Sequence, residues 1–397
     1  MTPPPPPAAD DAATPVCAQG VPPGERGEDA PPAGGHGTDG HGADGHGEDG
    51  HGEDGARQCP TSGRGEGRRP AVSVVIPVFD GAAFVAEAVA SALAQGPPGE
   101  VEVIAVDDGS RDGSAARLAA FGTRIVFEAG PHRGACAARN RGLALARAPL
   151  VAFLDADDTL LPGALAAQRQ AAARLGPRRI VFGDHVPVDA GGAPTPRPAR
   201  YAGLRPGAVP LAFMLEAGPM TTSPLYPAAA LAAVGGFDPA VRRGQEYNLN
   251  LRLVLAGWRF VYAPHPIYAR RAHPGPRIST ARHVHFAGTA ANLRWLQAAL
   301  ERACPEAIDD AALRVLARMG WHAGVGTLHR GEAPHECFAF AAAFGRRDDR
   351  EPLPALIRTL VAALGPRRAA DMLVAAQRLR GAMPAPLRRR ASALFWR

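Results

Sequence analysis

The chain has 397 residues, of which 46% are hydrophobic, so it can bury a sizeable core and fold as one large domain or two ordinary ones. Its formal charge of +6 is uneven, since residues 1–70 carry 12 acidic and five basic side chains, leaving 26 acidic and 39 basic ones in the remainder. No apolar run approaches the ~20 residues of a membrane helix, the N-terminus lacks a secretory signal pattern, and five scattered cysteines cannot all pair, so we expect a cytoplasmic protein.

Residues 1–70 form a tail rich in Pro, Gly, His and Asp. The tail opens with five prolines and repeats the pentad His-Gly-x-Asp-Gly from His36, His41, His46 and His51. Such a sequence cannot bury enough apolar surface to offset the entropy of ordering, and we predict disorder. The spaced histidines and carboxylates also suit loose Zn or Ni binding, although a solvated spacer is the favoured interpretation.

Strands and helices alternate from Val72 onward. Apolar runs rich in β-branched residues predict buried strands at 72–76, 101–106, 124–127 and 150–154. Helical periodicity predicts helices at 82–94, 114–121 and 135–146. This alternation with short connections predicts an α/β domain, with a mostly parallel Rossmann-like sheet and helices on both faces.

Acidic side chains follow three of these strands. Asp80 comes after the first, Asp107 and Asp108 after the second, and the acidic run 155–158 after the fourth. Ligands of such sheets bind at the carboxyl ends of the strands. Clustered carboxylates repel one another, and a divalent cation, Mg²⁺ or Mn²⁺, removes this penalty while bridging a diphosphate. We therefore predict a metal-dependent nucleotide-diphosphate site, with helix capping by the acidic run as the alternative.

The order of four motifs resembles the family 2 glycosyltransferases of the GT-A fold over about residues 71–275. These motifs are Val74–Phe79, Val106–Ser114, Ala138–Gly142 and Phe153–Asp158. The resemblance implies an inverting, hexosyltransferase-like enzyme with a nucleotide-diphosphate sugar as donor and Mn²⁺ or Mg²⁺ as cofactor. No nucleic-acid partner is expected.

The same resemblance assigns roles to individual residues. Asp107 and Asp108 are expected to contact the nucleoside, and the Asp-x-Asp motif is expected to contact the ribose and the metal through Asp155 and Asp157. Further candidates for donor binding are Pro77, Ala156 and Arg139, whose guanidinium group suits phosphate.

The segment 245–253, Gln-Glu-Tyr-Asn-Leu-Asn-Leu-Arg-Leu, extends the resemblance to catalysis. The family's general base aligns with Glu246, whose carboxylate would accept the proton of the acceptor hydroxyl group. Gln245 stands where an acid is common in the family, and Asn248 replaces another acid. The alternative is that Glu246 only begins an amphipathic helix with the following leucines inside.

The segment 268–273 resembles the family's Arg-x-x-His element. This resemblance implies that His273 approaches the metal or the diphosphate, and that Arg270 or Arg271 stabilises the leaving phosphate. A histidine in an ordinary surface turn is the alternative.

The remaining chain is predicted to contact the acceptor and the membrane. Residues 180–192 predict a hairpin and residues 194–206 an exposed loop, a region that contacts the glycan or lipid-linked acceptor in the family. Residues 283–397 predict helices, including 287–302 and 354–364. The last 20 residues contain six arginines and no acid. This composition suits peripheral contact with the anionic inner face of a membrane, or a solvated basic tail.

Other enzyme classes fit less well. A nucleotidyltransferase would follow its first strand with a glycine-rich basic loop, but residues 78–82 read Val-Phe-Asp-Gly-Ala. A dinucleotide oxidoreductase would need a Gly-x-Gly-x-x-Gly motif after a strand, and none is present. A catalytically silent relative that binds nucleotide sugars as a scaffold stays open. The predicted domains are the tail 1–70, the GT-A domain 71–282 and the helical region 283–397.

Overall fold

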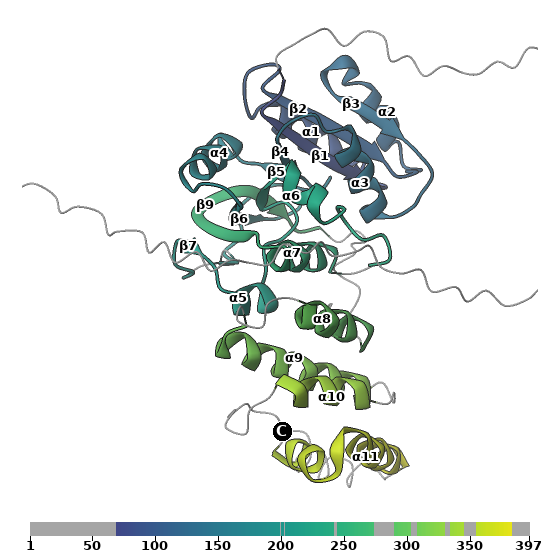
Figure 1. The fold of residues 1–397 in the computed structure, drawn as a ribbon. Helices are drawn as coiled ribbons and strands as arrows, with labels where there is room; N and C mark the ends of the chain where they lie inside the picture. Colours follow the sequence, from purple (N-terminus) through teal and green to yellow (C-terminus); the bar gives the residue numbers. More distant parts are fainter. Residues whose placement is uncertain are drawn as a thin grey trace, which may run out of the picture. The chain divides into compact units, whose positions relative to one another are not determined.

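The computed structural model describes residues 69–273 except 199, 202, 242 and 243, together with the segments 290–302, 308–329, 334–344 and 355–382. Figure 1 shows these residues coloured along the sequence. The tail up to residue 68 and the arginine-rich end from residue 383 lie outside the described residues. The predictions of disorder and of membrane contact therefore stay predictions.

The described residues form a nine-stranded sheet that confirms the predicted mostly parallel α/β fold. Four parallel strands form one half in the order β3-β2-β1-β4, with bounds Val126–Ala129, Val101–Asp107, Val72–Val78 and Leu150–Phe153. The order continues with β8 (Pro224–Pro227), β6 (Arg179–Val188), β9 (Arg259–Arg271) and β5 (Thr159–Leu160), while β7 (Gly207–Ala208) pairs with β9. Only β8, β5 and β7 run against the other strands.

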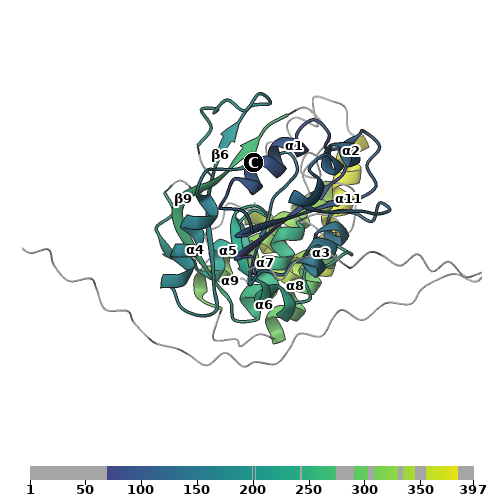
Figure 2. The ribbon, with the colours of Figure 1, turned by 90° about the horizontal axis from the view of Figure 1, so that it is seen from above.

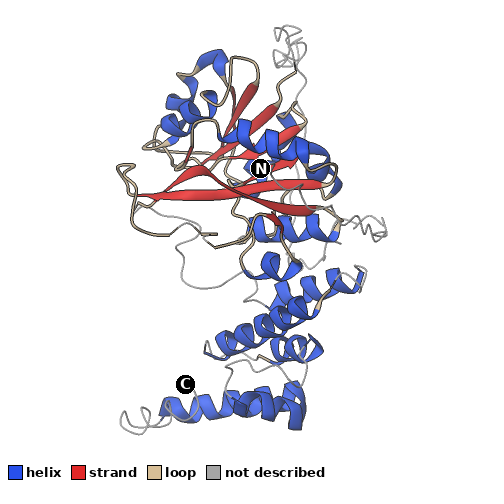
Figure 3. Cartoon of the chain, turned by 90° about the vertical axis from the view of Figure 1, so that its left-hand side faces the viewer, coloured by secondary structure: helices blue, strands red, loops and turns tan. Residues whose placement is uncertain are grey.

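Helices cover both faces of the sheet (Figure 3). One buried cluster joins the sheet to α1 (Val85–Leu93), α2 (Ser114–Ala119) and α4 (Ala164–Arg174). A second cluster joins the opposite face to α3 (Ala135–Leu145), α6 (Ala228–Ala233) and α7 (Gln245–Leu255). A short 3₁₀ turn, η1 (Gly122–Arg124), precedes β3.

The sequence of β1 explains this two-sided packing. Successive side chains of a strand point to opposite faces. Val74 and Ile76 therefore join the cluster of α1, whereas Val75 joins the cluster of α3. Helix α3 approaches β1 closely at Gly142, where an added Cβ would lie 2.3 Å from Cγ1 of Val75. Because a buried parallel strand needs apolar residues on both faces, its sequence reads as a continuous apolar run.

The half of the sheet after β4 differs in part from the predicted hairpin. β6 continues to Val188 and runs parallel to β9, beside which it lies in Figure 2. After the turn at 189–193, the chain returns along β6 only briefly, through a bridge between Val188 and Pro194 and a bond from the N–H of Thr195 to the carbonyl oxygen of Pro187. Most of the backbone of β6 therefore pairs with β8 and β9 and not with a hairpin partner.

The region after residue 283 is helical where it is described, as predicted. Its helices are α8 (Ala290–Arg302), α9 (Asp310–His329), α10 (His335–Phe344) and α11 (Ala355–Ala382). Leu296 of α8 and Val315 of α9 belong to the same buried cluster as α5 (Leu211–Glu216) and α7. Helix α11 is interrupted at Gly365, which has φ 77° and precedes Pro366. In the described segments, every helix is too short or too polar to cross a bilayer.

Candidate active site

Three loops lie together at the carboxyl ends of β2, β1 and β4, which are neighbouring strands of the sheet. The loops after β1 and β2 are joined by hydrogen bonds around Asp80, whose φ of 48° is in the left-handed region. Its backbone N–H donates to Oγ of Ser110 at 3.0 Å, and its Oδ1 accepts from the N–H of Arg111 at 2.8 Å. The N–H of Ala82 donates to Oδ2 of Asp112 at 2.8 Å. These bonds hold Asp80 in its strained conformation and fix one wall of the site.

Asp107, the last residue of β2, carries an acceptor without a partner. Its carboxylate is buried, and Oδ2 accepts only a long bond of 3.3 Å from the N–H of Ser110. Oδ1 has no hydrogen-bond partner among the described residues. A buried oxygen left unpaired costs about 1–3 kcal/mol, so a ligand that brings an N–H or O–H group would be favoured here.

Asp108, by contrast, is engaged by the protein itself. Oδ1 accepts from the N–H of Arg133 and Oδ2 from the N–H of Gly134, both at 2.8 Å. The ring Nδ1 of His132 lies 2.9 Å from Oδ2. Asp108 therefore fixes residues 132–134, the turn that leads into α3, a structural role that the sequence analysis did not predict.

An aromatic pair beside these aspartates was also missed. Phe79 is 49% exposed at the end of β1, although large apolar side chains are usually buried. Its ring lies 4.1 Å from the ring of His132, between centroids. A phenylalanine directly after a predicted strand, next to the acidic loops, was the available signal.

Asp155 begins the loop after β4 and pairs with Arg139 of α3. Nη2 of the arginine donates to Oδ1 of Asp155 at 2.7 Å, and Nη1 donates to Oε1 of Gln245 at 2.7 Å. The guanidinium group lies over the ring of Phe237, 5.3 Å from its centroid. Two predicted candidates, Asp155 and Arg139, thus meet, and Gln245 joins them, but Arg139 is engaged by protein groups.

Asp157 lies beside His273, as the Arg-x-x-His resemblance implies. Nε2 of His273 is 3.1 Å from Oδ2 of Asp157, and the imidazole ring packs 4.8 Å from the ring of Phe84. The two side chains present a nitrogen and an oxygen next to each other. In the part of the chain that is described, no three His, Cys, Asp or Glu side chains gather to hold a metal by themselves.

Asp158 points inward and anchors the loop. It is buried, and its Oδ1 accepts from the N–H of Arg271 at 3.0 Å. Burial, together with the charges of Asp157 and Asp155, raises the pKa of Asp158 well above its ordinary value, and the bond from Arg271 opposes this only in part. The acidic loop therefore has a surplus of negative charge that a cation would relieve.

The two adjacent arginines at the end of β9, Arg270 and Arg271, differ in what they contact. The guanidinium group of Arg271 donates to the carbonyl oxygens of Ala190 at 2.8 Å and Asp157 at 3.3 Å, and it pairs with Glu87. Arg271 therefore braces the acidic loop from behind. Arg270 is half-buried, and its side chain makes no hydrogen bond or ion pair within the described residues. Of the two predicted phosphate contacts, only Arg270 has its guanidinium group available.

Glu246 lies in the first turn of α7, which starts after Gly244 with φ 65°. Its side chain is half-buried and makes no hydrogen bond or ion pair within the described residues, so its carboxylate is available to a ligand. Asn248 is buried instead and accepts from Nε of Arg252 at 2.9 Å. The helix also packs inward through Leu249, Leu251 and Leu253, as the alternative interpretation held.

The last two predicted donor contacts lie at the edge of the site. Pro77 is half-buried in β1, directly beside Val106 of β2. Ala156 packs against the loop after β1, since a Cβ added at Gly81 would lie 3.4 Å from Cβ of Ala156. Neither residue brings a polar side chain, so any contact with a ligand would be apolar or through the backbone.

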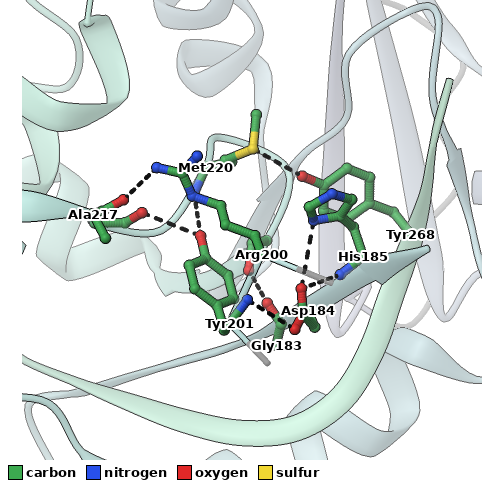
Figure 4. A network of polar contacts seen from close by, with 10 residues as sticks. Gly183, Asp184, His185, Arg200, Tyr201, Ala217, Met220 and Tyr268 are labelled. Carbon is green, nitrogen blue, oxygen red and sulfur yellow. Dashed lines mark hydrogen bonds and ion pairs between the residues drawn. The ribbon is translucent and has the colours of Figure 1, made fainter. Parts of the chain in front are cut away.

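A buried polar network forms a further wall beside β6 and β9 (Figure 4). Oδ2 of Asp184 accepts from the N–H of Tyr201 at 3.1 Å, and the hydroxyl group of Tyr201 donates to the carbonyl oxygen of Gly218 at 3.1 Å. The N–H of Met220 donates to the same hydroxyl oxygen at 3.1 Å. The prediction of an exposed loop over 194–206 is wrong at Tyr201, which is only 4% exposed.

His185 completes this wall. Its ring stacks on Tyr268 with centroids 5.5 Å apart, and its Nδ1 lies 3.5 Å from Oδ1 of Asp184. Burial lowers the pKa of His185, with help from Arg270 and Arg200, although Asp184 acts in the opposite direction. Burial therefore disfavours the charged form of this imidazole.

Comparison with known proteins gives a family match. Residues 73–216 match the family model described as Glycosyl transferase family 2. The succinoglycan biosynthesis protein ExoU of Rhizobium meliloti strain 1021 is 35% identical over 207 residues, which are 48% of this chain and 58% of that protein. A pre-mycofactocin glycosyltransferase of Mycobacterium tuberculosis H37Rv is 30% identical over 280 residues, 65% of this chain and 54% of that protein. The chain thus spans little more than half the length of these curated relatives.

The fold also matches a solved structure. The crystal structure of S. aureus TarS 1–349 in complex with UDP-GlcNAc aligns with a TM-score of 0.51 and 18% identity, covering 76% of this chain and 83% of that one. This likeness confirms the predicted fold class.

Proposed function

The chain belongs to the family 2 glycosyltransferases through residues 73–216, and on this premise we propose that it transfers a sugar from a nucleotide-diphosphate sugar to an acceptor hydroxyl group, with inversion at the anomeric carbon. The observation that carries the proposal is the contact between two metal-type donors, Oδ2 of Asp157 on the loop after β4 and Nε2 of His273 after β9, which lie 3.1 Å apart. Asp157 belongs to the loop with surplus negative charge.

The nucleoside would bind at the ends of β1 and β2. The unpaired Oδ1 of Asp107 can accept an N–H of the base or a hydroxyl group of the ribose. The exposed ring of Phe79 offers a surface on which a base can stack. Pro77 and Ala156 would line this pocket, and Asp108 would shape it by holding residues 132–134.

Mn²⁺ or Mg²⁺ would be held by Asp157 and His273. Donors about 3 Å apart are neighbours in octahedral coordination with bonds of about 2.1 Å, and the diphosphate and water commonly fill the other positions. Asp155, the other predicted ligand, would contribute through Oδ2 because Oδ1 is bonded to Arg139. The cation, when bound, would neutralise charge on the leaving diphosphate.

Glu246 would act as the general base. Its carboxylate would take the proton of the acceptor hydroxyl group while that oxygen forms a bond to the anomeric carbon. The bond from the anomeric carbon to the phosphate oxygen breaks in the same displacement, and its electrons leave with the nucleoside diphosphate. Attack opposite the leaving group inverts the anomeric configuration. Arg270 can contact the departing diphosphate, since its guanidinium group has no partner among the described residues.

The acceptor class follows from a relative. The name of the Rhizobium meliloti protein refers to succinoglycan biosynthesis, so we extend to this chain a role in the synthesis of a cell-surface polysaccharide, glycolipid or other glycan. The acceptor would then be a glycan or a lipid-linked glycan. The arginine-rich residues 386–397 would hold a cytoplasmic enzyme at the inner membrane face. Unchanged binding to anionic vesicles after deletion of these residues would remove the membrane part of the proposal.

A donor panel tests the function directly. The purified protein is incubated with UDP-, GDP- and dTDP-sugars and Mn²⁺, and release of the nucleoside diphosphate is measured. Turnover is expected for at least one donor, and Glu246→Gln should abolish it while nucleotide binding remains. Glu100→Gln is the matched control, because Glu100 precedes β2 at the opposite edge of the sheet, where it pairs with Arg169. Tight nucleotide binding without any turnover in the wild type would favour the silent scaffold instead.

A further inference from the structure

We infer that Arg139 is a positioning residue that couples the donor loop to the first turn of α7, and so sets where Glu246 stands relative to the bound donor. The expected effect of this coupling on kcat rests on the proposed transferase function. The coupling itself does not rest on that function, because it is a property of the folded chain without ligands.

Arg139 joins three segments that are far apart in the sequence. The arginine belongs to α3, Asp155 is 16 residues away on the donor loop, and Gln245 is 106 residues away at the start of α7. Both hydrogen bonds measure 2.7 Å, and the arginine side chain is only 7% exposed. One rigid, planar group therefore fixes the distance between the two segments.

The surroundings of the guanidinium group keep it in place. Phe237 lies beneath it at 5.3 Å and contributes a cation–π contact. The backbone of Phe237 is itself fixed by the next residue of α3, because Asn140 accepts its N–H at 2.8 Å and donates to its carbonyl oxygen at 2.7 Å. Helix α3 thus holds both the arginine and the ring against which it packs.

Gln245 gives the coupling a particular charge distribution. A neutral amide at this position leaves Asp155 as the one carboxylate paired with Arg139 among the described residues. A glutamate there would share the guanidinium charge between two carboxylates. The glutamine, which departs from the family's common acid, therefore keeps Asp155 fully paired while it anchors the turn that carries Glu246.

Two variants separate the halves of the coupling. Gln245→Leu releases α7 but keeps the bond between Arg139 and Asp155, so kcat should fall about 100-fold while the affinity for the panel-identified nucleoside diphosphate with Mn²⁺ stays within threefold. Arg139→Met releases both segments, so kcat and nucleotide affinity should both fall. Gln245→Glu keeps an acceptor oxygen and should retain at least tenfold more kcat than Gln245→Leu. Arg141→Met is the control, since Arg141 lies on the same helix and pairs with Glu128.

Hydrogen exchange of the ligand-free protein tests the coupling without activity. In Arg139→Met, amide exchange should accelerate in residues 154–158 and in 245–250 together, and neither segment should change in Arg141→Met. Separate or absent changes in these two segments overturn the inference, as does equal kcat in Gln245→Leu and wild type. If the wild type turns over no donor but the paired exchange changes occur, the proposed function fails while the coupling stands.

Discussion

Replacement of Asp108 by alanine should destabilise the fold, because this carboxylate anchors the turn that leads into α3. The change removes two bonds of 2.8 Å to the backbone N–H groups of Arg133 and Gly134, and the contact with His132. Hydrogen bonds to a charged acceptor contribute about 1.5–3 kcal/mol each. Water can reach the partly buried loop after the change, so we expect a loss of about 2–4 kcal/mol in the free energy of unfolding.

Urea denaturation followed by circular dichroism measures this loss. Asp189→Ala is the matched control, because Asp189 also accepts a backbone N–H, that of Ala193 at 2.9 Å, but in an exposed turn. The control should cost no more than about 1 kcal/mol. Equal losses in the two variants, with nucleotide binding abolished only in Asp108→Ala, would refute the anchoring role and favour a direct nucleoside contact.

Three further outcomes follow from the packing and the titrating groups. Gly142→Ala should cost about 1–3 kcal/mol in the same assay, because the added Cβ would overlap Val75, and combining it with Val75→Ala should cost less than the sum of the two single changes. Iodoacetamide at pH 8 should leave Cys136 unmodified in peptide mass spectra of the native protein, since burial raises the pKa of this thiol to about 11; modification as fast as in urea would contradict this. The pKa of His185 is lowered in the folded chain, so below about pH 6.5 this histidine is protonated more fully in the unfolded chain than in the folded one. The free energy of unfolding should therefore fall as the pH drops below about 6.5. That fall should be smaller in His185→Gln, and an identical pH dependence would argue against a neutral buried imidazole.

The first half of the sheet was predictable because local sequence determines it. Runs such as 72–76 are apolar on both faces, and their strands form close to the predicted bounds. Helix α1 starts at Val85 and not at residue 82, because the N–H of Ala82 bonds to Asp112 on another loop. β9 is one strand of 13 residues that contains Pro264 and Pro266. Its parallel partner β6 shifts register near these prolines, which allows a strand to pass through them.

The candidate site was likewise predictable only in part. The acidic positions were recognisable because they follow strands whose ends meet at one edge of the sheet. The contacts of each carboxylate were not recognisable from the sequence, since these contacts join residues that are distant in the chain. Asp108 is used by residues 132–134, and Asp155 by Arg139. Tyr201 illustrates the same limit, because nothing in a loop rich in Pro, Arg and Ala indicates that one tyrosine reaches back to Asp184.

Tyr201 fastens the connection between β6 and β7 to the rest of the fold. Asp184 holds the backbone of this tyrosine, and Gly218 and Met220 hold its hydroxyl group, so the chain is fastened on both sides of the connection. The mostly exposed residues 190–198 precede this anchor and are themselves held by the bond from Arg271 to Ala190 and the bond from Thr195 to Pro187. Under the proposed function, substitutions at the exposed residues 196–198 would alter acceptor preference while the backbone of the sheet keeps its geometry.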